Sequence, residues 1–150
     1  QRPNIILLGD YNIAHTPIDI HDPKGNKNSS GFLPEERAWM DKFLNSGWID
    51  TFRYKHPTVT GAYSWWSQRF PTVRLQNKGW RIDYICVTST LENKIVDAGI
   101  LPDVKHSDHC PVFLTIKKSN YYNYYALKLL IERIPFYIIF EVKLTHTIST

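Results

Sequence analysis

Three carboxylates, an amide and a histidine stand where the chain could present them to a substrate. Each lies at or near the end of an apolar run, and together they are Asp10, Asn12, Asp83, Asp108 and His109. Such donors could bind a hard divalent cation, which suits Mg²⁺ or Mn²⁺ better than zinc. They could also orient a water molecule against a phosphorus atom and stabilise the charge that develops there. Taken singly, these residues have simpler interpretations, because Gly, Asp and Asn are ordinary turn residues.

A second feature is a stretch of cations and aromatic rings between Arg53 and Ile82. No Asp or Glu interrupts its six basic residues, which are Arg53, Lys55, Arg69, Arg74, Lys78 and Arg81. The aromatic residues between them are Tyr54, Tyr63, Trp65, Trp66, Phe70 and Trp80. Cations that meet phosphates and rings that stack on bases or sugars are typical of a nucleic-acid surface. The alternative is a solvated basic loop beside aromatic residues of the core.

Length and composition indicate one globular domain. The chain has 150 residues, of which 43% are hydrophobic, enough for a packed core. Its two cysteines, Cys86 and Cys110, make neither a disulfide framework nor a zinc site, so we expect reduced thiols in a cytoplasmic, intracellular setting. We find no signal peptide and no apolar run that could span a bilayer. The start at Gln1, without Met, leads us to expect a larger parent protein.

The elements that must position these residues can be predicted from apolar runs and breakers. We expect a long polar loop over Asp10–Gly31 and a helix over Pro34–Ser46, which Pro34 and two following acids favour. Its buried face is predicted to hold Trp39, Met40, Phe43 and Leu44. The predicted strands are Asn4–Leu8, Tyr63–Trp66, Trp80–Val87, Ile95–Leu101 and Pro111–Ile116. Their order and short links predict a fold of the α/β class, of the α+β type, with a mostly antiparallel sheet.

Two points in this prediction stay open. Alternation along the strand at Trp80–Val87 puts Trp80 and Ile82 on one face and Arg81 and Asp83 on the other. It therefore does not show that Asp83 converges with the aromatic residues. The character of the chain also changes after Lys118, and we treat residues 119–150 as a tail separate from residues 1–118. That tail could add a packed helix or strand, or could be an extension without structural meaning.

Six segments together resemble the exonuclease III/AP endonuclease group of the endonuclease/exonuclease/phosphatase superfamily. They occur in the family's order and read GDYNIAHTPIDI, SGFLPEERAWMDKFL, DTFR, YSWWSQR, NKGWRIDY and SDHCPV. The resemblance covers Asn4 to Ile116, about the last half of the family's catalytic domain. It implies part of a four-layered α/β sandwich and a Mg²⁺-dependent phosphodiesterase, with Mn²⁺ as an alternative. It also implies cleavage of double-stranded DNA 5′ to abasic sites and at 3′ ends.

The resemblance assigns roles to the residues that match its motifs. Asp10 matches the aspartate that positions or deprotonates the attacking water, and Asn12 the amide that holds phosphate and nucleophile. His109 matches a histidine on the scissile phosphate, and Asp83 the carboxylate that orients it. The implied metal site comprises Asp10, Asn12, Asp108 and His109. The implied substrate contacts are Trp65, Trp80 and Ile82, which match the pocket for a base-less sugar, together with Arg81 and Lys78.

The family's N-terminal half, which supplies the principal metal-ligating glutamate, has no counterpart in the matched segments. We therefore expect little or no nuclease activity from these residues alone. The intact enzyme would be an active monomer that acts on DNA. In a bacterium it would act at the nucleoid, and we do not expect it at a membrane. Two alternatives remain. One is a non-catalytic DNA-binding fragment, and the other is a superfamily phosphatase that acts on a lipid or inositol phosphate. The basic-aromatic stretch favours DNA over the lipid substrate.

Overall fold

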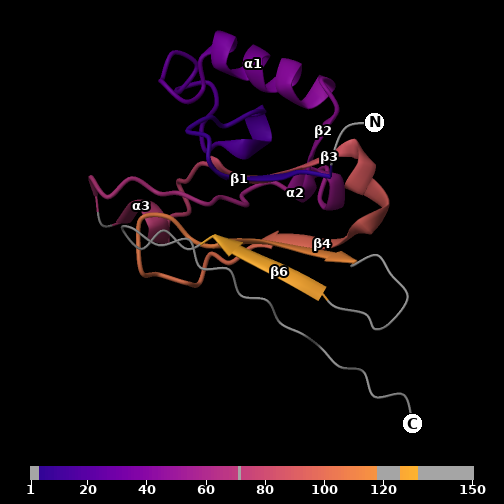
Figure 1. Cartoon of the computed structure of the whole chain (residues 1–150). Coiled ribbons are helices and arrows are strands. Elements are labelled where there is room, and N and C mark those ends of the chain that lie inside the picture. The colour runs from indigo at the N-terminus through magenta and orange to yellow at the C-terminus, as the bar shows by residue number, and fades with distance from the viewer. Residues whose placement is uncertain (1–3, 71, 118–125, 132–150) are drawn as a thin grey trace.

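The computed structural model describes residues 4–70, 72–117 and 126–131 and places two antiparallel sheets in separate layers (Figure 1). The first sheet has the order β1-β3-β2, formed by β1 (Ile6–Asp10), β3 (Asp83–Thr88) and β2 (Trp48–Asp50). The second has the order β4-β5-β6, formed by β4 (Ile95–Ile100), β5 (Val112–Lys117) and β6 (Ala126–Ile131). The predicted mixed fold with antiparallel sheets is confirmed.

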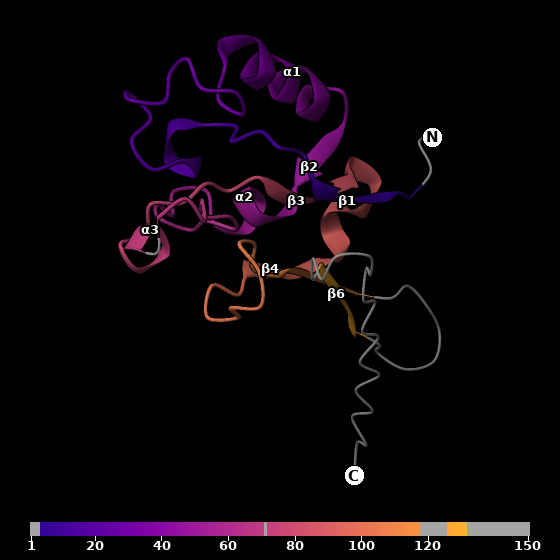
Figure 2. The same ribbon diagram turned by 90° about the vertical axis from the view of Figure 1, so that its left-hand side faces the viewer.

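The helices lie on and between these layers. The longest described helix, α1 (Pro34–Asn45), covers the outer face of the first sheet, and the view turned by 90° keeps this order of layers (Figure 2). The shorter elements are η1 (Pro17–Asp19), α2 (Thr51–Lys55), α3 (Thr72–Leu75) and η2 (Ser89–Lys94). Within the described residues, no helix is both long and apolar enough to cross a bilayer.

Strand β3 is the centre of the core, because all six of its residues are buried. Alternate side chains of a strand point to opposite faces. Accordingly, Tyr84 and Cys86 pack with Met40 of α1, whereas Ile85 and Val87 pack with residues of the second sheet. Both cysteines are free and buried, as expected for reduced thiols, and burial raises the pKa of each to about 12.

Several predicted boundaries need correction. Strand β1 ends at Asp10 rather than Leu8, and β3 begins at Asp83 rather than Trp80. Tyr63–Trp66 is not a regular strand, because Trp65 forms only isolated bridges. Trp39 is 50% exposed and so does not belong to the buried face of α1. It lies at the edge of the apolar stripe and stacks on Phe43, with 5.4 Å between ring centroids.

Part of the predicted tail is described by the structure. Residues Ala126–Ile131 form β6, which pairs with β5 in a register that puts Ile131 opposite Val112 and Ala126 opposite Lys117. The rest of the predicted tail, and with it the boundary at residue 118, lies outside the described residues. The division of the chain into two parts therefore stays a prediction.

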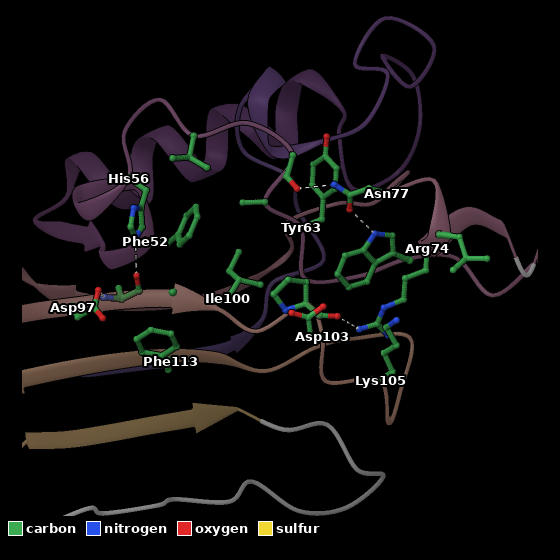
Figure 3. Close-up of a pocket in the computed structure, with 18 residues that line it drawn as sticks. Phe52, His56, Tyr63, Arg74, Asn77, Asp97, Ile100, Asp103, Lys105 and Phe113 are labelled. Atoms are coloured by element: carbon green, nitrogen blue, oxygen red, sulfur yellow. Dashed lines mark hydrogen bonds between the residues drawn. The ribbon is translucent and has the colours of Figure 1, made fainter.

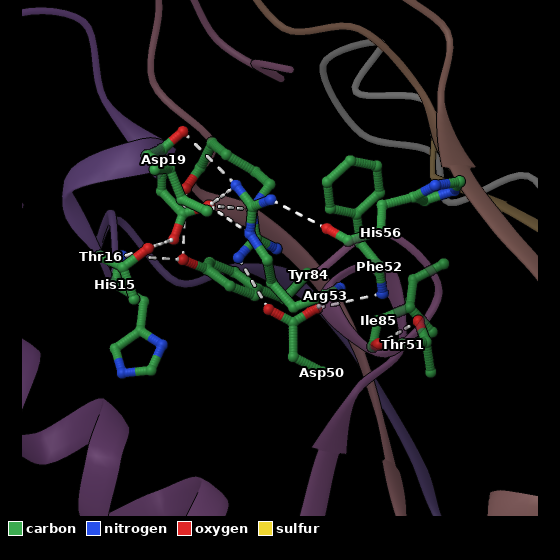
Figure 4. A network of polar contacts seen from close by, with 12 residues as sticks. His15, Thr16, Asp19, Asp50, Thr51, Phe52, Arg53, His56, Tyr84 and Ile85 are labelled. Atoms are coloured by element: carbon green, nitrogen blue, oxygen red, sulfur yellow. Dashed lines mark hydrogen bonds and ion pairs between the residues drawn. The ribbon is translucent and has the colours of Figure 1, made fainter. Parts of the chain in front are cut away.

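A buried network of charges ties the Asp10–Gly31 loop to the segment that precedes β3 and to α2. The side chains of Arg81 and Asp19 are fully buried, and Arg81 Nε donates to Asp19 Oδ1 at 2.6 Å. Arg81 Nη2 donates to Asp50 Oδ2 at 2.7 Å, and Arg53 Nε donates to Asp19 Oδ1 at 3.0 Å. Asp19, Arg53 and Asp50 gather around this centre beside Tyr84 (Figure 4). Charged groups this deep are stable only when paired, so the network holds the loop in one position.

This network predicts a loss of stability in acid. Burial alone would raise the pKa of Asp19, but Arg81, Arg53 and the Thr16 hydroxyl lower the pKa of this carboxyl far below its ordinary value. Its contribution to the free energy of unfolding is thus complete above the unfolded-state pKa and declines as the pH falls below that value. In urea titrations at pH 6, 4 and 3, the stability difference between the native chain and Asp19→Asn should narrow with each step. A constant difference would contradict the assignment.

Candidate active site

The two strands that carry Asp10 and Asp83 bring these carboxylates together. Asp10 is the last residue of β1, Asp83 is the first of β3, and the antiparallel register places them directly opposite each other. Side chains at opposite positions of an antiparallel pair project to the same face, with Cβ atoms about 5 Å apart. The strand pairing therefore brings Asp10 and Asp83 together at one end of the first sheet.

His109 completes this group from a third part of the chain. It bridges Trp65 just before β5, and its imidazole is buried with 7% exposure. His109 Nδ1 lies 2.8 Å from Asp83 Oδ2, and an ionised carboxylate can only accept, so the imidazole donates. One ligand atom from each of Asp10, Asp83 and His109 lies within 4.8 Å of the other two. These three residues form the candidate site, which we call the Asp-Asp-His group.

The charge of this group favours a protonated histidine. Burial opposes protonation, but the hydrogen bond and negative charge of Asp83, with the charges of Asp10 and Asp108, outweigh it. The pKa of His109 is therefore raised above its ordinary value. A histidine that is held in orientation by one nitrogen and carries a positive charge can bind a phosphate oxygen through the other nitrogen.

Asn12 lies beside the group on an exposed turn. Its backbone N–H donates to Asp10 Oδ1 at 2.8 Å, and its φ of 54° lies in the left-handed region that Asn tolerates better than most residues. The backbone N–H of Tyr11 donates to the carbonyl of Ile82, which joins this turn to the approach to β3. The structure thus places Asn12 on the turn that follows β1, tied to Asp10 through its backbone.

Asp108 lies next to the Asp-Asp-His group, and its carboxylate is held by neighbouring donors. Its carboxylate accepts from Trp65 Nε1 at 3.0 Å and from the Ser107 hydroxyl at 3.0 Å. Burial alone would raise the pKa of Asp108, but these donors and the charge of His109 lower it. The residues whose ligand atoms lie close enough together to hold a metal ion are Asp10, Asp83 and His109. Asp108 instead orients Trp65, and its part in metal binding stays a prediction.

Four of the five predicted substrate-binding residues are of three kinds. Trp65 and Trp80 are partly exposed and meet edge to face, with 6.0 Å between centroids. Ile82 is buried beneath them in a cluster with Ala14, Ile20 and Phe32, so it supports the aromatic pair from below. Lys78 is exposed.

Arg81 is a correction to the prediction. Its side chain is fully buried and its guanidinium is engaged by Asp19 and Asp50, so it is not available to a substrate. Arg81 is next to Trp80 in sequence, but its side chain points to the opposite face of this segment, as the alternation over Trp80–Asp83 indicated.

The sequence also missed a residue that supports the site. Ser64 is fully buried, and its hydroxyl accepts the backbone N–H groups of Ile82 and Asp83, each at 3.1 Å. It therefore fixes the start of β3, where Asp83 must lie to reach His109. No local pattern predicts this role, since the contact spans almost twenty residues and serine is common in loops.

Comparisons with known proteins show which proteins the chain resembles. A family model described as the Endonuclease/Exonuclease/phosphatase family matches residues 1–112. The chain is 49% identical over 116 residues to a Bacillus subtilis (strain 168) exodeoxyribonuclease, covering 77% of this chain and 46% of that protein. The chain thus spans less than half the length of this relative.

Solved structures show the same partial overlap. The AP endonuclease LMAP from Leishmania major superposes with a TM-score of 0.71 at 36% identity, over 76% of this chain and 35% of that one. The 3′ phosphatase NExo from Neisseria, solved with a product DNA hairpin, gives a TM-score of 0.71 at 28% identity, over 77% of this chain and 46% of that one.

Proposed function

Since the chain belongs to the endonuclease/exonuclease/phosphatase family, and within it to the exonuclease III/AP endonuclease group, we propose that it supplies catalytic residues of a DNA-repair phosphodiesterase. The proposed reaction is hydrolysis of a DNA phosphodiester bond 5′ to an abasic site or at a 3′ end. The observation that carries the proposal is the Asp-Asp-His group, whose members lie between 26 and 99 residues apart in sequence but within 4.8 Å in space.

The residues of the group and the neighbouring Asn12 divide the work of hydrolysis. Asp10 orients an attacking water and accepts its proton, while Asn12, whose backbone is tied to Asp10, holds the phosphate beside it. His109 donates a hydrogen bond or a proton to a phosphate oxygen as negative charge develops there. Asp83 keeps the imidazole in the required tautomer through the Nδ1 hydrogen bond.

The donor set also fits a hard divalent cation. Mg²⁺ usually takes one or two protein carboxylates and keeps several waters. Asp10 and the neighbouring Asp83, with Asn12 beside them, would therefore provide enough protein ligands to hold it. When bound, Mg²⁺ or Mn²⁺ would supply positive charge to the phosphate. We retain Mg²⁺ as the proposed cofactor, with Mn²⁺ as the alternative.

The proposed substrate rests on the aromatic pair and on the relatives. Trp65 and Trp80 meet at right angles next to the group and present ring surface that a base-less sugar could occupy. The relatives bear names such as exodeoxyribonuclease and AP endonuclease, and one structure holds a DNA hairpin. These names favour DNA over a lipid or inositol phosphate. DNA also fits an intracellular location and a monomeric intact enzyme, both of which stay part of the proposal.

A nuclease assay on two proteins tests this function. The first is the 150-residue chain, and the second, called the restored protein, carries in front of Gln1 the part of the Bacillus subtilis exodeoxyribonuclease that precedes the matched segment. We expect Mg²⁺-dependent cleavage of an abasic-site duplex by the restored protein, its complete loss in EDTA, and little cleavage by the chain alone. Asp10→Asn in the restored protein should remove cleavage while duplex binding persists.

Each alternative has its own outcome in this assay. Binding of the duplex without cleavage by the restored protein would favour a non-catalytic DNA-binding role. Release of phosphate from an inositol phosphate, with no action on DNA, would favour the phosphatase. Cleavage that survives EDTA would contradict the metal, and strong cleavage by the chain alone would contradict the need for the preceding part.

A further inference from the structure

Arg74 was counted from sequence among the cations that meet phosphates, but its guanidinium has internal partners. It lies on α3 and reaches the loop of residues 101–111, which joins β4 to β5 and carries Asp108 and His109. Nη1 donates to the carbonyl of Ser107 at 2.7 Å, and Nη2 donates to the carbonyls of Pro102 and Val104 at 2.9 and 2.8 Å. Figure 3 shows Arg74 pointing toward the part of this loop that bears Asp103 and Lys105.

The first part of the loop borders a cavity, whereas its last residues, including Cys110, are buried. A cavity of about 910 Å³ lies beneath it, lined in part by Phe52, Ile100 and Phe113 (Figure 3). Pro102, Asp103 and Lys105 border the same cavity and are exposed. Since a loop over an open cavity gains few van der Waals contacts there, hydrogen bonds to a fixed cation must supply much of its order.

The carbonyl at Ser107 connects this contact to the candidate active site. The Ser107 hydroxyl donates to Asp108 Oδ1 at 3.0 Å and accepts the backbone N–H of His109 at 3.3 Å. Arg74 therefore fixes the backbone one residue before Asp108 and two before His109. Displacement of Ser107 would move both residues relative to Asp83 and Trp65.

The other face of the guanidinium rests on the basic-aromatic stretch. Arg74 Cζ lies 4.3 Å from the ring centroid of Trp66, in the range of a cation–π contact. The backbone N–H of Trp66 donates to the carbonyl of Asp108 at 2.9 Å, and its indole donates to Asn77. The same cation thus contacts the proposed DNA-facing stretch and the loop that holds His109.

We propose that Arg74 is a positioning residue, which holds the 101–111 loop so that His109 meets Asp83. The role in catalysis rests on the proposed function, but the positioning itself does not. Lysine cannot substitute, because a guanidinium offers a planar fork of donors to several carbonyls at once, whereas an ammonium group is a single point charge. Arg74→Lys keeps the charge and removes the fork.

The test uses the 150-residue chain, free of added metal, as the native chain, Arg74→Lys and the control Arg69→Lys. Arg69 lies five residues earlier on the same stretch and is exposed. Amide hydrogen exchange is measured along the chain, and NMR follows the proton that His109 Nδ1 shares with Asp83. For Arg74→Lys we expect exchange within residues 101–110 to rise about tenfold or more, as loss of charge-assisted bonds implies, and the His109 resonance to shift or broaden. Arg69→Lys should change neither.

Two results would overturn the proposal. If Arg74→Lys matched Arg69→Lys, Arg74 would have no hold on the loop. If exchange rose equally in α1 and β3, or the variant failed to fold, Arg74 would be a general stabilising residue instead. Neither readout involves DNA cleavage, so a failure of the proposed nuclease function would leave this test intact.

Discussion

Replacing Arg81 with methionine is expected to lower the free energy of unfolding by about 3–5 kcal/mol, the usual range when one partner of a buried ion pair is removed. The substitution keeps most of the side-chain volume but leaves two buried carboxylates, Asp19 and Asp50, without the cation that faces both. Arg53 still contacts Asp19, so the larger cost should fall on Asp50. Urea unfolding at pH 7, followed by tryptophan fluorescence, measures the change.

Two further variants identify the cause of that loss. Arg69→Met removes an exposed cation from the same stretch and should change stability by less than about 0.5 kcal/mol. Adding Asp50→Asn to Arg81→Met removes one of the unpaired charges and should restore part of the lost stability. If the double variant were less stable than Arg81→Met, the desolvation of Asp50 would not be the source of the effect.

The burial of Arg81 could not be predicted from the sequence. Its type and its aromatic neighbours are those of a DNA-contacting residue, and nothing adjacent in the chain indicates burial. The carboxylates that neutralise it lie 62 and 31 residues away, at the end of η1 and immediately before α2. Such a network is decided by tertiary packing, which a local pattern of charges does not contain.

How well each helix or strand is predicted likewise depends on how much local pattern its sequence contains. The helix at Pro34 could be predicted, because proline, acids and an apolar stripe agree over twelve residues. Strand β2 has three residues and α2 has five, too few for a recognisable period, and neither was predicted. Trp39 is predicted on the buried face of α1 because its spacing fits the apolar stripe of that helix. The part of the stripe that is buried is narrower than the positions of its apolar residues suggest, and Trp39 lies outside it.

For the candidate site, the residue types were predictable and their convergence was not. Motif resemblance identified Asp10, Asp83 and His109, but no local pattern in the sequence shows that they meet. Their meeting depends on a register that puts Asp10 opposite Asp83, and on a loop held from α3. Both are contacts between distant segments, so they appear only once the chain is folded.

The largest expected effect on activity is that of His109. In the restored protein, His109→Ala should lower kcat on an abasic-site duplex by about 10²–10⁴-fold, the usual contribution of a positioned acid or base. Asp83→Asn should act in the same direction, because an amide can present its N–H to Nδ1 and favour the wrong tautomer of the imidazole. Single-turnover cleavage at saturating enzyme separates this chemical step from binding.

The matched control is His106→Ala, since His106 lies three residues earlier on the same loop and is exposed. It should leave kcat unchanged, and all three variants should bind the duplex within a few-fold of the native affinity, because phosphate contacts elsewhere supply most of the binding energy. If His109→Ala cut as fast as His106→Ala, the buried imidazole would be a structural partner of Asp83 and the Asp-Asp-His group would not be the reaction centre. If binding fell in step with cleavage, His109 would hold the substrate rather than act on its phosphate in the transition state.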